Sequence, residues 1–415
     1  MATHVRSFSK INLGLAIGPA RADGFHGLTT MYQTLALRDV VTVAATRSPE
    51  TSIVLTSNHP WVPGDNRNTA WKMVERCLER MGVTATVKIR IQKNLPVQGG
   101  MGAGSANAAA ALMGLEKELG VALPGPERME LAASVGSDVP LFLLGGSVLG
   151  LGRGEQVYPL PDLPETICVM ALPEVGVSTP QAFRDWDGLG GGGVDGGSPT
   201  DFGSGPTHRE RQRRDEWGTG LSTGLGTDFA ANSGGLTEST GRDTLSELSC
   251  ALASTYAEPG TSGIFCKPGT QSTEYGIETQ GRAEKKAGEF DQSIGQLQTD
   301  LAENTLLALV RTGIENDFEK VVFPIHPSLR EIKRQLMGIR QNESANAGSG
   351  SLDGADSSGP ALYAALSGSG SALFGLYRSM ADAIAAQQRV QALGCKAVIT
   401  HTLPRTAYWR TMFAG

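Results

Sequence analysis

The sequence of 415 residues predicts an α+β protein with two domains. Strand-like apolar runs alternate with helical patterns over the first 160 residues, and a β-α-β pattern closes the chain, which suits an α+β sandwich. A chain of this length also carries enough apolar surface for two separate cores. The predicted domains are therefore residues 1–160 and 161–415.

The expected elements follow the apolar periodicity in chain order. In the first domain we expect helices at 69–80, 106–119 and 127–135 between short strands. In the second we expect strands from 167, at 372–377 and at 396–402, with helices at 301–312, 328–337 and 379–392.

Two low-complexity insertions, at about 186–300 and 341–358, interrupt the second domain. The first holds 23 of the 54 glycines and 17 acidic against 9 basic residues, so it carries the acidity of a chain whose net charge is −6. Such a composition buries too little apolar surface to offset its ordering entropy. We expect mobile surface loops with, at most, a short helix at 244–253. A regulatory or partner-binding role for them stays open.

Composition argues against several classes of function. A net charge of −6 lacks the basic face of a nucleic-acid-binding protein. The sequence has no secretory signal and no apolar run of membrane-spanning length, so we expect no membrane partner and a cytoplasmic location. Its oligomeric state stays open between a monomer and a weak homodimer. The cysteines and histidines lack metal-ligand spacing, and we expect buried or incidental thiols: Cys77, Cys168, Cys250, Cys266, Cys395, His4, His26, His59, His208, His326 and His401.

The most informative segment is a proline-led, glycine-rich loop that runs into an alanine-rich helix at residues 96–112. Glycines let backbone N–H groups approach an anion, and the helix N-terminus adds unpaired N–H groups and the positive end of its dipole. The loop lacks the Gly-Lys-Ser/Thr ending of a Walker loop and the G-x-G-x-x-G spacing of dinucleotide folds. The expected phosphate-binding residues are Pro96, Val97, Gln98, Gly99, Gly100, Met101, Gly102, Ala103, Gly104, Ser105 and Ala106. A plain turn before a packed helix is the alternative.

Three further segments accompany this loop. Residues 9–15 alternate as a strand that presents Lys10 and Asn12 on one face, and lead into a turn with Phe25 and His26. Residues 136–142 form a turn that carries the lone acid Asp138 into an apolar run. Residues 365–374 hold a second Gly/Ser loop before a hydrophobic strand.

These four segments, in this order, resemble the GHMP kinase superfamily of small-molecule kinases. Two further stretches, 173–179 and 316–319, are similar to signatures of that superfamily. The resemblance covers residues 1 to about 184 and about 300 to 415. It implies an N-terminal domain like domain 2 of ribosomal protein S5, a C-terminal ferredoxin-like α/β sandwich, and an active site in the cleft between them.

The resemblance implies a reaction and roles. The Phe25-His26 element is most similar to members with a cytidylyl acceptor, so the expected substrates are ATP and 4-diphosphocytidyl-2-C-methyl-D-erythritol, phosphorylated on its 2-hydroxyl. Asp138 would accept the hydroxyl proton and Lys10 would draw charge from the oxygen. Mg²⁺ would bridge the ATP phosphates near Ser105; no acidic metal ligand is identifiable. The expected substrate-binding residues are Asn12, Phe25, His26 and Ser369.

Other interpretations stay open. The chain could phosphorylate another alcohol of the homoserine or mevalonate type, or bind a ligand without catalysis. Phe25, Ala103 and Ala106 stand where the superfamily has tyrosine, glycine and serine. Singly, Asp138 could be a turn or cap, Lys10 a solvated strand lysine, and His26 a packed histidine. Residues 367–371 could form a plain hairpin turn. Asn68 resembles an asparagine that the superfamily has near its site, but it could equally belong to an ordinary Asn-rich turn.

Overall fold

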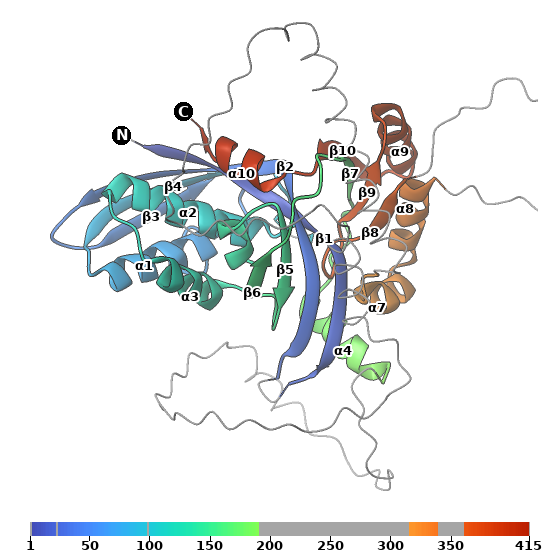
Figure 1. Cartoon of the computed structure of the whole chain (residues 1–415), viewed down its shortest axis with the longest axis horizontal. Helices are drawn as coiled ribbons and strands as arrows, with labels where there is room; N and C mark the ends of the chain where they lie inside the picture. Colours follow the sequence, from blue (N-terminus) through green and yellow to red (C-terminus); the bar gives the residue numbers. More distant parts are fainter. Residues whose placement is uncertain (1, 22–23, 98, 191–314, 339–360, 415) are drawn as a thin grey trace, which may run out of the picture. The chain divides into compact units, whose positions relative to one another are not determined.

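The computed structural model describes residues 2–21, 24–97, 99–190, 315–338 and 361–414, all of which fall in one compact unit (Figure 1). Over these residues the fold is α+β, as predicted, with one seven-stranded and one four-stranded sheet. The helices are α1 (Thr69–Met81), α2 (Ala103–Leu119), α3 (Gly125–Val135), α4 (Thr179–Gly188), α7 (Phe318–Ile325), α8 (Pro327–Met337), α9 (Met380–Ala392), α10 (Arg405–Thr411) and the short 3-10 helix η1 (Pro140–Leu143). The strands are β1 (Thr3–Ala20), β2 (His26–Arg47), β3 (Ser52–Ser57), β4 (Ala85–Gln92), β5 (Ser147–Leu151), β6 (Gln156–Pro159), β7 (Ile167–Leu172), β8 (Tyr363–Leu366), β9 (Leu373–Tyr377), β10 (Lys396–His401) and β11 (Phe413–Ala414).

The first sheet is built on the two long antiparallel strands β1 and β2. Its order is β11-β1-β2-β4-β3, with β5 paired to the other end of β2 and β6 paired to β5. Register shifts in the β1–β2 ladder, one of them between Asn12 and Gly14, bend the pair. Helices α1, α2 and α3 cover one face of this sheet, and a large apolar core lies between them (Figure 1). One end of β2 therefore pairs with β4 and the other with β5.

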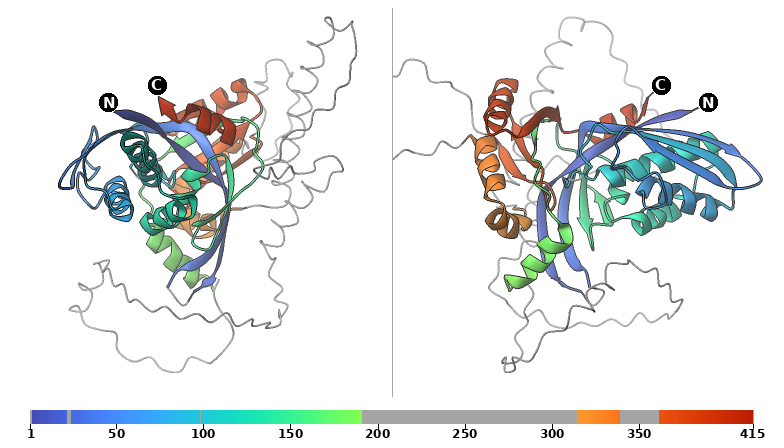
Figure 2. Two further views of the ribbon diagram at one scale, coloured as in Figure 1. Left: turned by 60° about the vertical axis from the view of Figure 1, so that its left-hand side comes forward. Right: turned by 180° about the vertical axis from the view of Figure 1, so that it is seen from behind.

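The second sheet has the order β10-β7-β9-β8 and is antiparallel throughout. Helices α7, α8 and α9 pack on its outer side, as both views of Figure 2 show in orange and red. A third core fills the space between the two sheets, with Ile11 and Leu13 from β1 against Met170 and Phe374. Because strand side chains alternate, this leaves Lys10 and Asn12 on the opposite face of β1.

The chain returns to its first half at its C-terminal end. Helix α10 places Tyr408 in the first core together with the following Met412, and β11 pairs with β1. The Tyr408 hydroxyl donates to the carbonyl of Phe142 at 2.6 Å. The last residues therefore close the first core rather than the second.

Most expected elements are confirmed within one to three residues, including α1, α3, α8, α9, β7, β9 and β10. Helix α2 begins at Ala103, three residues before the expected start, because Gly102 in the left-handed region (φ +67°) ends the loop. The expected insertion start at 186 is a few residues early, since α4 continues to Gly188. The expected helices at 301–312 and 244–253, and the insertions at 191–300 and 341–358, lie outside the described residues. No helix among those described is long and apolar enough to cross a membrane.

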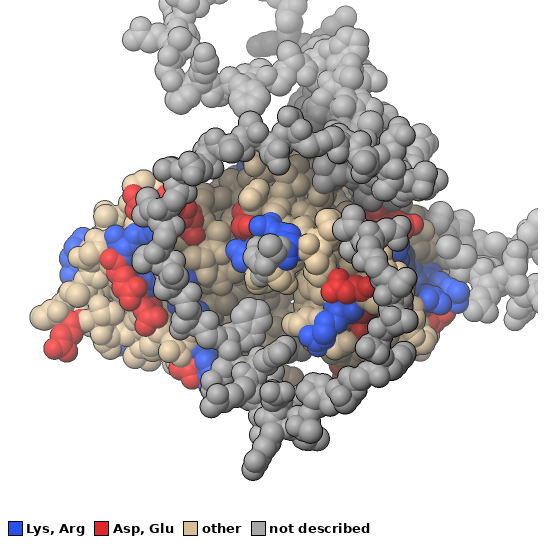
Figure 3. Space-filling model, turned by 90° about the horizontal axis from the view of Figure 1, so that it is seen from below, with Lys and Arg blue, Asp and Glu red and all other residues tan. Residues whose placement is uncertain are grey.

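A buried carboxylate, Asp39 of β2, ties the loop before α2 to the sheet. Its Oδ1 accepts hydrogen bonds from the backbone N–H groups of Asn94 (2.7 Å) and Leu95 (2.8 Å). Its Oδ2 accepts from Lys93 Nζ at 2.5 Å and from Asn107 Nδ2 of α2 at 3.2 Å. Asp39 and Lys93 are both buried, whereas Figure 3 shows other Lys and Arg beside Asp and Glu on the surface. The strand, the loop and the helix thus share one anchor.

Replacing Asp39 by asparagine keeps the acceptor for the two backbone N–H groups but leaves the Lys93 charge buried without its counter-ion. We expect Asp39→Asn to lower the free energy of unfolding by about 3–5 kcal/mol, the usual cost of breaking one side of a buried pair. Urea denaturation followed by circular dichroism measures it. Asp65→Asn, which removes the exposed partner of Arg67, is the control and should change stability little. Equal losses in the two variants would contradict the anchoring role.

Candidate active site

The glycine-rich loop ends at the N-terminus of α2, as the sequence predicted. No side chain caps this helix end, so the N–H groups of Ala103, Gly104 and Ser105 lack intrahelical partners. Such an end attracts anions, phosphate among them. Ala103 and Ala106 are packed into apolar cores, and Gln98 lies outside the described residues.

Two of the loop glycines are required by close contacts. Gly100 has φ +73°, and a Cβ there would lie 2.0 Å from the carbonyl oxygen of Ser367. A Cβ on Gly102 would lie 3.0 Å from Cζ of Phe142 and 3.1 Å from Cγ of Lys10. The loop therefore passes directly between Lys10 and the second Gly/Ser loop, an approach that only glycine permits.

Lys10 and Asp138 come together beside this loop. Lys10 Nζ lies 3.5 Å from Asp138 Oδ2, and the Lys10 backbone N–H donates to the carbonyl of Met101 at 3.1 Å. Burial lowers the pKa of Lys10 from its ordinary value, and the Asp138 carboxylate partly offsets this. The Asp138 side chain keeps 29% of its surface exposed. A half-open carboxylate beside a buried ammonium can accept a proton from a bound hydroxyl.

Asn12 holds the ammonium group of Lys10. Lys10 Nζ donates to Asn12 Oδ1 at 2.6 Å, and Asn12 Nδ2 donates to Thr30 Oγ1 at 2.8 Å. The Thr30 hydroxyl donates in turn to the carbonyl of Gly14 at 2.7 Å, next to the register shift in β1. This chain of bonds fixes both strand residues that the alternation had placed on one face.

Ser105 lies in the first turn of α2, next to the turn that carries Asp138. A Cβ built on Gly136 would lie 3.7 Å from Ser105 Oγ. Asn68, by contrast, caps α1: its Oδ1 accepts from the backbone N–H of Ala70 at 2.9 Å. The described residues contain no cluster of three His, Cys, Asp or Glu side chains able to hold a metal ion.

The second Gly/Ser loop, residues 367–371, joins β8 to β9 and packs on the first loop. Ser367 Oγ donates to the carbonyl of Gly100 at 3.0 Å, and the N–H of Ala372 donates to the carbonyl of Gly99 at 3.3 Å. Asn316 Nδ2 stabilises this second loop by donating to the carbonyls of Leu366 (2.8 Å) and Gly368 (2.7 Å). It is thus a hairpin turn and also a wall of the loop cluster.

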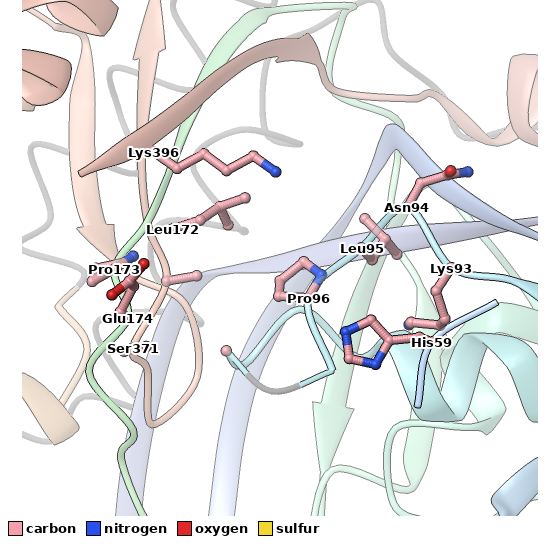
Figure 4. Close-up of a pocket in the computed structure, with 12 residues that line it drawn as sticks. His59, Lys93, Asn94, Leu95, Pro96, Leu172, Pro173, Glu174, Ser371 and Lys396 are labelled. Atoms are coloured by element: carbon pink, nitrogen blue, oxygen red, sulfur yellow. The ribbon is translucent and has the colours of Figure 1, made fainter. Parts of the chain in front are cut away.

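Two cavities flank Gly99. One, of about 340 Å³, lies between residues 93–96 and the second sheet; Figure 4 shows Pro96 and Lys93 facing Leu172 and Lys396 across it. The other, of about 570 Å³, is lined by both Gly-rich loops and by residues 176–180. Thr179 and Ser369 meet in it, with their hydroxyl oxygens 2.6 Å apart. Neither Lys10 nor Asp138 lines either of these two cavities.

Phe25 immediately precedes β2, and His26 is its first residue and contacts α4. His26 is buried, its Nε2 lies 2.7 Å from Asp187 Oδ1, and its ring stacks on Phe183 with centroids 5.0 Å apart. Phe25 is 40% exposed, with the Arg153 guanidinium 5.0 Å from its ring centroid. No direct contact joins either residue to Lys10 or Asp138 among the described interactions. His26 is thus packed against α4 in this structure, and its role in substrate binding stays a prediction.

Sequence reasoning missed several residues of this region: Tyr32, Asp39, Phe183 and Asp187. Tyr32 Oη donates to Asp138 Oδ1 at 3.0 Å. In the sequence, Tyr32 and Phe183 resemble core aromatic residues, Asp39 resembles an acid at the end of a strand, and Asp187 lies in the first part of the expected insertion. Only their tertiary contacts distinguish them.

Comparison with known proteins identifies what the chain and its fold are similar to. Residues 68–146 match the family described as GHMP kinases N terminal domain. A solved 4-(cytidine 5'-diphospho)-2C-methyl-D-erythritol kinase has 20% identity and a TM-score of 0.53, covering 96% of this chain and 98% of its own. A homoserine kinase from Cytophaga hutchinsonii has 16% identity and the same TM-score of 0.53, covering 97% and 95%. The described residues therefore have the fold of the GHMP kinases, and residues 68–146 match the N-terminal domain of that family.

Two relatives show what part of the chain is similar to in sequence. A protein from Solibacter usitatus (strain Ellin6076) is 39% identical over 186 residues, which is 44% of this chain and 56% of that protein. One from Rhodococcus jostii (strain RHA1) is 42% identical over 185 residues, which is 45% and 59%. Both are named 4-diphosphocytidyl-2-C-methyl-D-erythritol kinase. The chain therefore spans a little over half the length of these two relatives.

Proposed function

We propose that this protein is an ATP-dependent kinase that phosphorylates the 2-hydroxyl of 4-diphosphocytidyl-2-C-methyl-D-erythritol, an isoprenoid precursor. The observation that carries the proposal is the buried Lys10 held 3.5 Å from Asp138, next to the uncapped N-terminus of α2. The names of relatives with 39–42% identity support the choice of substrate.

The reaction needs positioning and charge stabilisation more than covalent chemistry. The substrate hydroxyl would lie against Asp138 Oδ2 and give its proton to that carboxylate. Its oxygen would then form the new bond to the γ-phosphorus as the bond between that phosphorus and the ADP oxygen breaks. Lys10 would draw negative charge from the attacking oxygen, and ADP would leave with the bonding pair.

The N-terminus of α2 would hold the phosphates of ATP. The N–H groups of Gly104 and Ser105 are free of intrahelical partners and stand at the positive end of the helix dipole. Mg²⁺ usually binds through substrate phosphates with few protein ligands, which fits a site that offers the Ser105 hydroxyl and no acidic cluster in the described residues. When bound, the ion would neutralise charge on the phosphates.

Each of the two cavities beside Gly99 would hold part of a different substrate. The cavity lined by Thr179 and Ser369 lies near α4, whose Phe183 contacts His26, and would take the cytidylyl alcohol. The cavity between residues 93–96 and β7 would take the nucleoside of ATP. Phe25 would stack on the cytosine, as aromatic rings favour. His26 would offer its remaining ring nitrogen to the base, because Nε2 already faces Asp187.

We expect Asp138→Asn to leave ATP binding nearly intact and to lower kcat by about 100-fold or more, the scale of a positioned general base. ADP release coupled to NADH oxidation measures turnover, and isothermal titration calorimetry measures ATP binding. Asp65→Asn, an exposed carboxylate in the same half of the chain, is the control. Near-normal turnover in Asp138→Asn would rule out Asp138 as the base.

The cytosine pocket has its own test. Phe25→Ala should raise KM for the cytidylyl substrate. The binding free energy lost should be about 1–3 kcal/mol if the ring stacks on the cytosine as aromatic side chains stack on nucleic-acid bases. The KM for ATP should barely move, and Phe25→Tyr should be neutral or favourable.

Phe413→Ala removes another exposed ring that lies against a cation, Lys117, and is the matched control. It should change neither KM. If Phe25→Ala weakens ATP and spares the cytidylyl substrate, the pocket assignment fails.

A further inference from the structure

Tyr32 contacts the oxygen of the Asp138 carboxylate that does not face Lys10, and the Lys10 ammonium also lies 5.6 Å from the centroid of the Tyr32 ring. Tyr32 lies on β2 directly opposite Asn12 of β1, in the segment where β2 also pairs with β5. Its hydroxyl donates to Asp138 Oδ1 at 3.0 Å, whereas Lys10 Nζ lies 3.5 Å from Oδ2. The two carboxylate oxygens therefore face different donors, one neutral and one cationic.

The tyrosine is fixed in place by its packing. It is 2% exposed, and two glycines leave the room it occupies. A Cβ on Gly150 would lie 2.5 Å from Tyr32 Cε2, and a Cβ on Gly154 would lie 2.4 Å from Tyr32 Oη. A side chain held this tightly presents its hydroxyl in one direction, so its partner is oriented too.

The same surroundings keep the hydroxyl protonated. Burial first, and then the negative charges of Asp138 and Glu155, raise the pKa of Tyr32 well above its ordinary value. Tyr32 is therefore a hydrogen-bond donor at neutral pH and cannot itself take the proton of a substrate hydroxyl.

We propose that Tyr32 is a positioning residue: by binding Asp138 Oδ1 it fixes the rotation of the carboxylate, so that Oδ2 faces Lys10 and the acceptor hydroxyl. This proposal rests on the proposed function, in which Asp138 is the base. A freely turning carboxylate would present the wrong oxygen or angle part of the time, and small misplacements at a reacting group are costly.

The test compares Tyr32→Phe with Tyr408→Phe. Both remove one buried hydroxyl from a tyrosine of the same half of the molecule, and Tyr408 Oη bonds only to the carbonyl of Phe142 among the described contacts. We expect Tyr32→Phe to lower kcat by about 10-fold, the scale of one hydrogen bond to a charged group, with both KM values within twofold of wild type. Tyr408→Phe should leave kcat unchanged.

A double-mutant cycle asks whether the effect passes through Asp138. Adding Tyr32→Phe to Asp138→Asn should lower the residual kcat by less than twofold, because the group that Tyr32 positions is already gone. A full additional 10-fold loss would show that Tyr32 acts elsewhere and would overturn the proposal. So would an unchanged kcat in the single variant.

A readout without turnover separates this proposal from the proposed function. The ¹³C resonance of the Asp138 carboxyl, assigned by its loss in Asp138→Asn, should move in Tyr32→Phe and stay in place in Tyr408→Phe. A resonance that does not move overturns the positioning role, even if Asp138→Asn is inactive. If the resonance moves and Asp138→Asn remains fully active, the hydrogen bond is real, but Asp138 is not the base and the catalytic role of Tyr32 fails, while the proposed kinase activity stands.

Discussion

Asp39 is a fully buried carboxylate, and the neighbouring residues supply the hydrogen-bond donors that it needs. Burying an unpaired charge is costly, so Asp39 is retained only with its full set of donors: the Lys93 ammonium, two backbone N–H groups and the Asn107 amide. Those donors lie on the segment entering the glycine-rich loop and on the helix leaving it. Because both ends of the loop are held by β2, its carbonyls reach Lys10 and the second Gly/Ser loop.

Local patterns predicted most of the elements correctly. Helix α1 is flanked by an Asn cap and a left-handed glycine, and α9 by a Ser cap, so sequence marks their ends. The glycine-rich loop was recognisable because closely spaced glycines, such as Gly100 and Gly102, indicate a backbone with positive φ angles and close contacts. Lys10 and Asn12 were placed on one face by strand alternation alone. These features depend on neighbours in sequence, which is why a sequence can reveal them.

The contacts that complete the region depend on distant parts of the chain. Tyr32 is one of many apolar-looking strand residues until the fold brings Asp138 to its hydroxyl, 106 positions away. Asp187 looked like the start of a Gly-rich insertion, yet α4 carries it to His26. The roles of Asn12, Phe25, His26 and Ser369 stay predictions. The structure defines their contacts; the Ser369 hydroxyl, for example, is hydrogen-bonded to that of Thr179.

The central claim is that this site transfers phosphate to a cytidylyl alcohol, and substrate choice by the full chain tests it most directly. With ATP and Mg²⁺, kcat/KM would be measured for 4-diphosphocytidyl-2-C-methyl-D-erythritol, homoserine and mevalonate, with the product examined by ³¹P NMR. The account predicts a preference of about a thousandfold or more for the cytidylyl compound, since polar groups built for its base stay unpaired with the others. It also predicts phosphate on the 2-hydroxyl. Preference for homoserine or mevalonate, or turnover of none of the three, would contradict it.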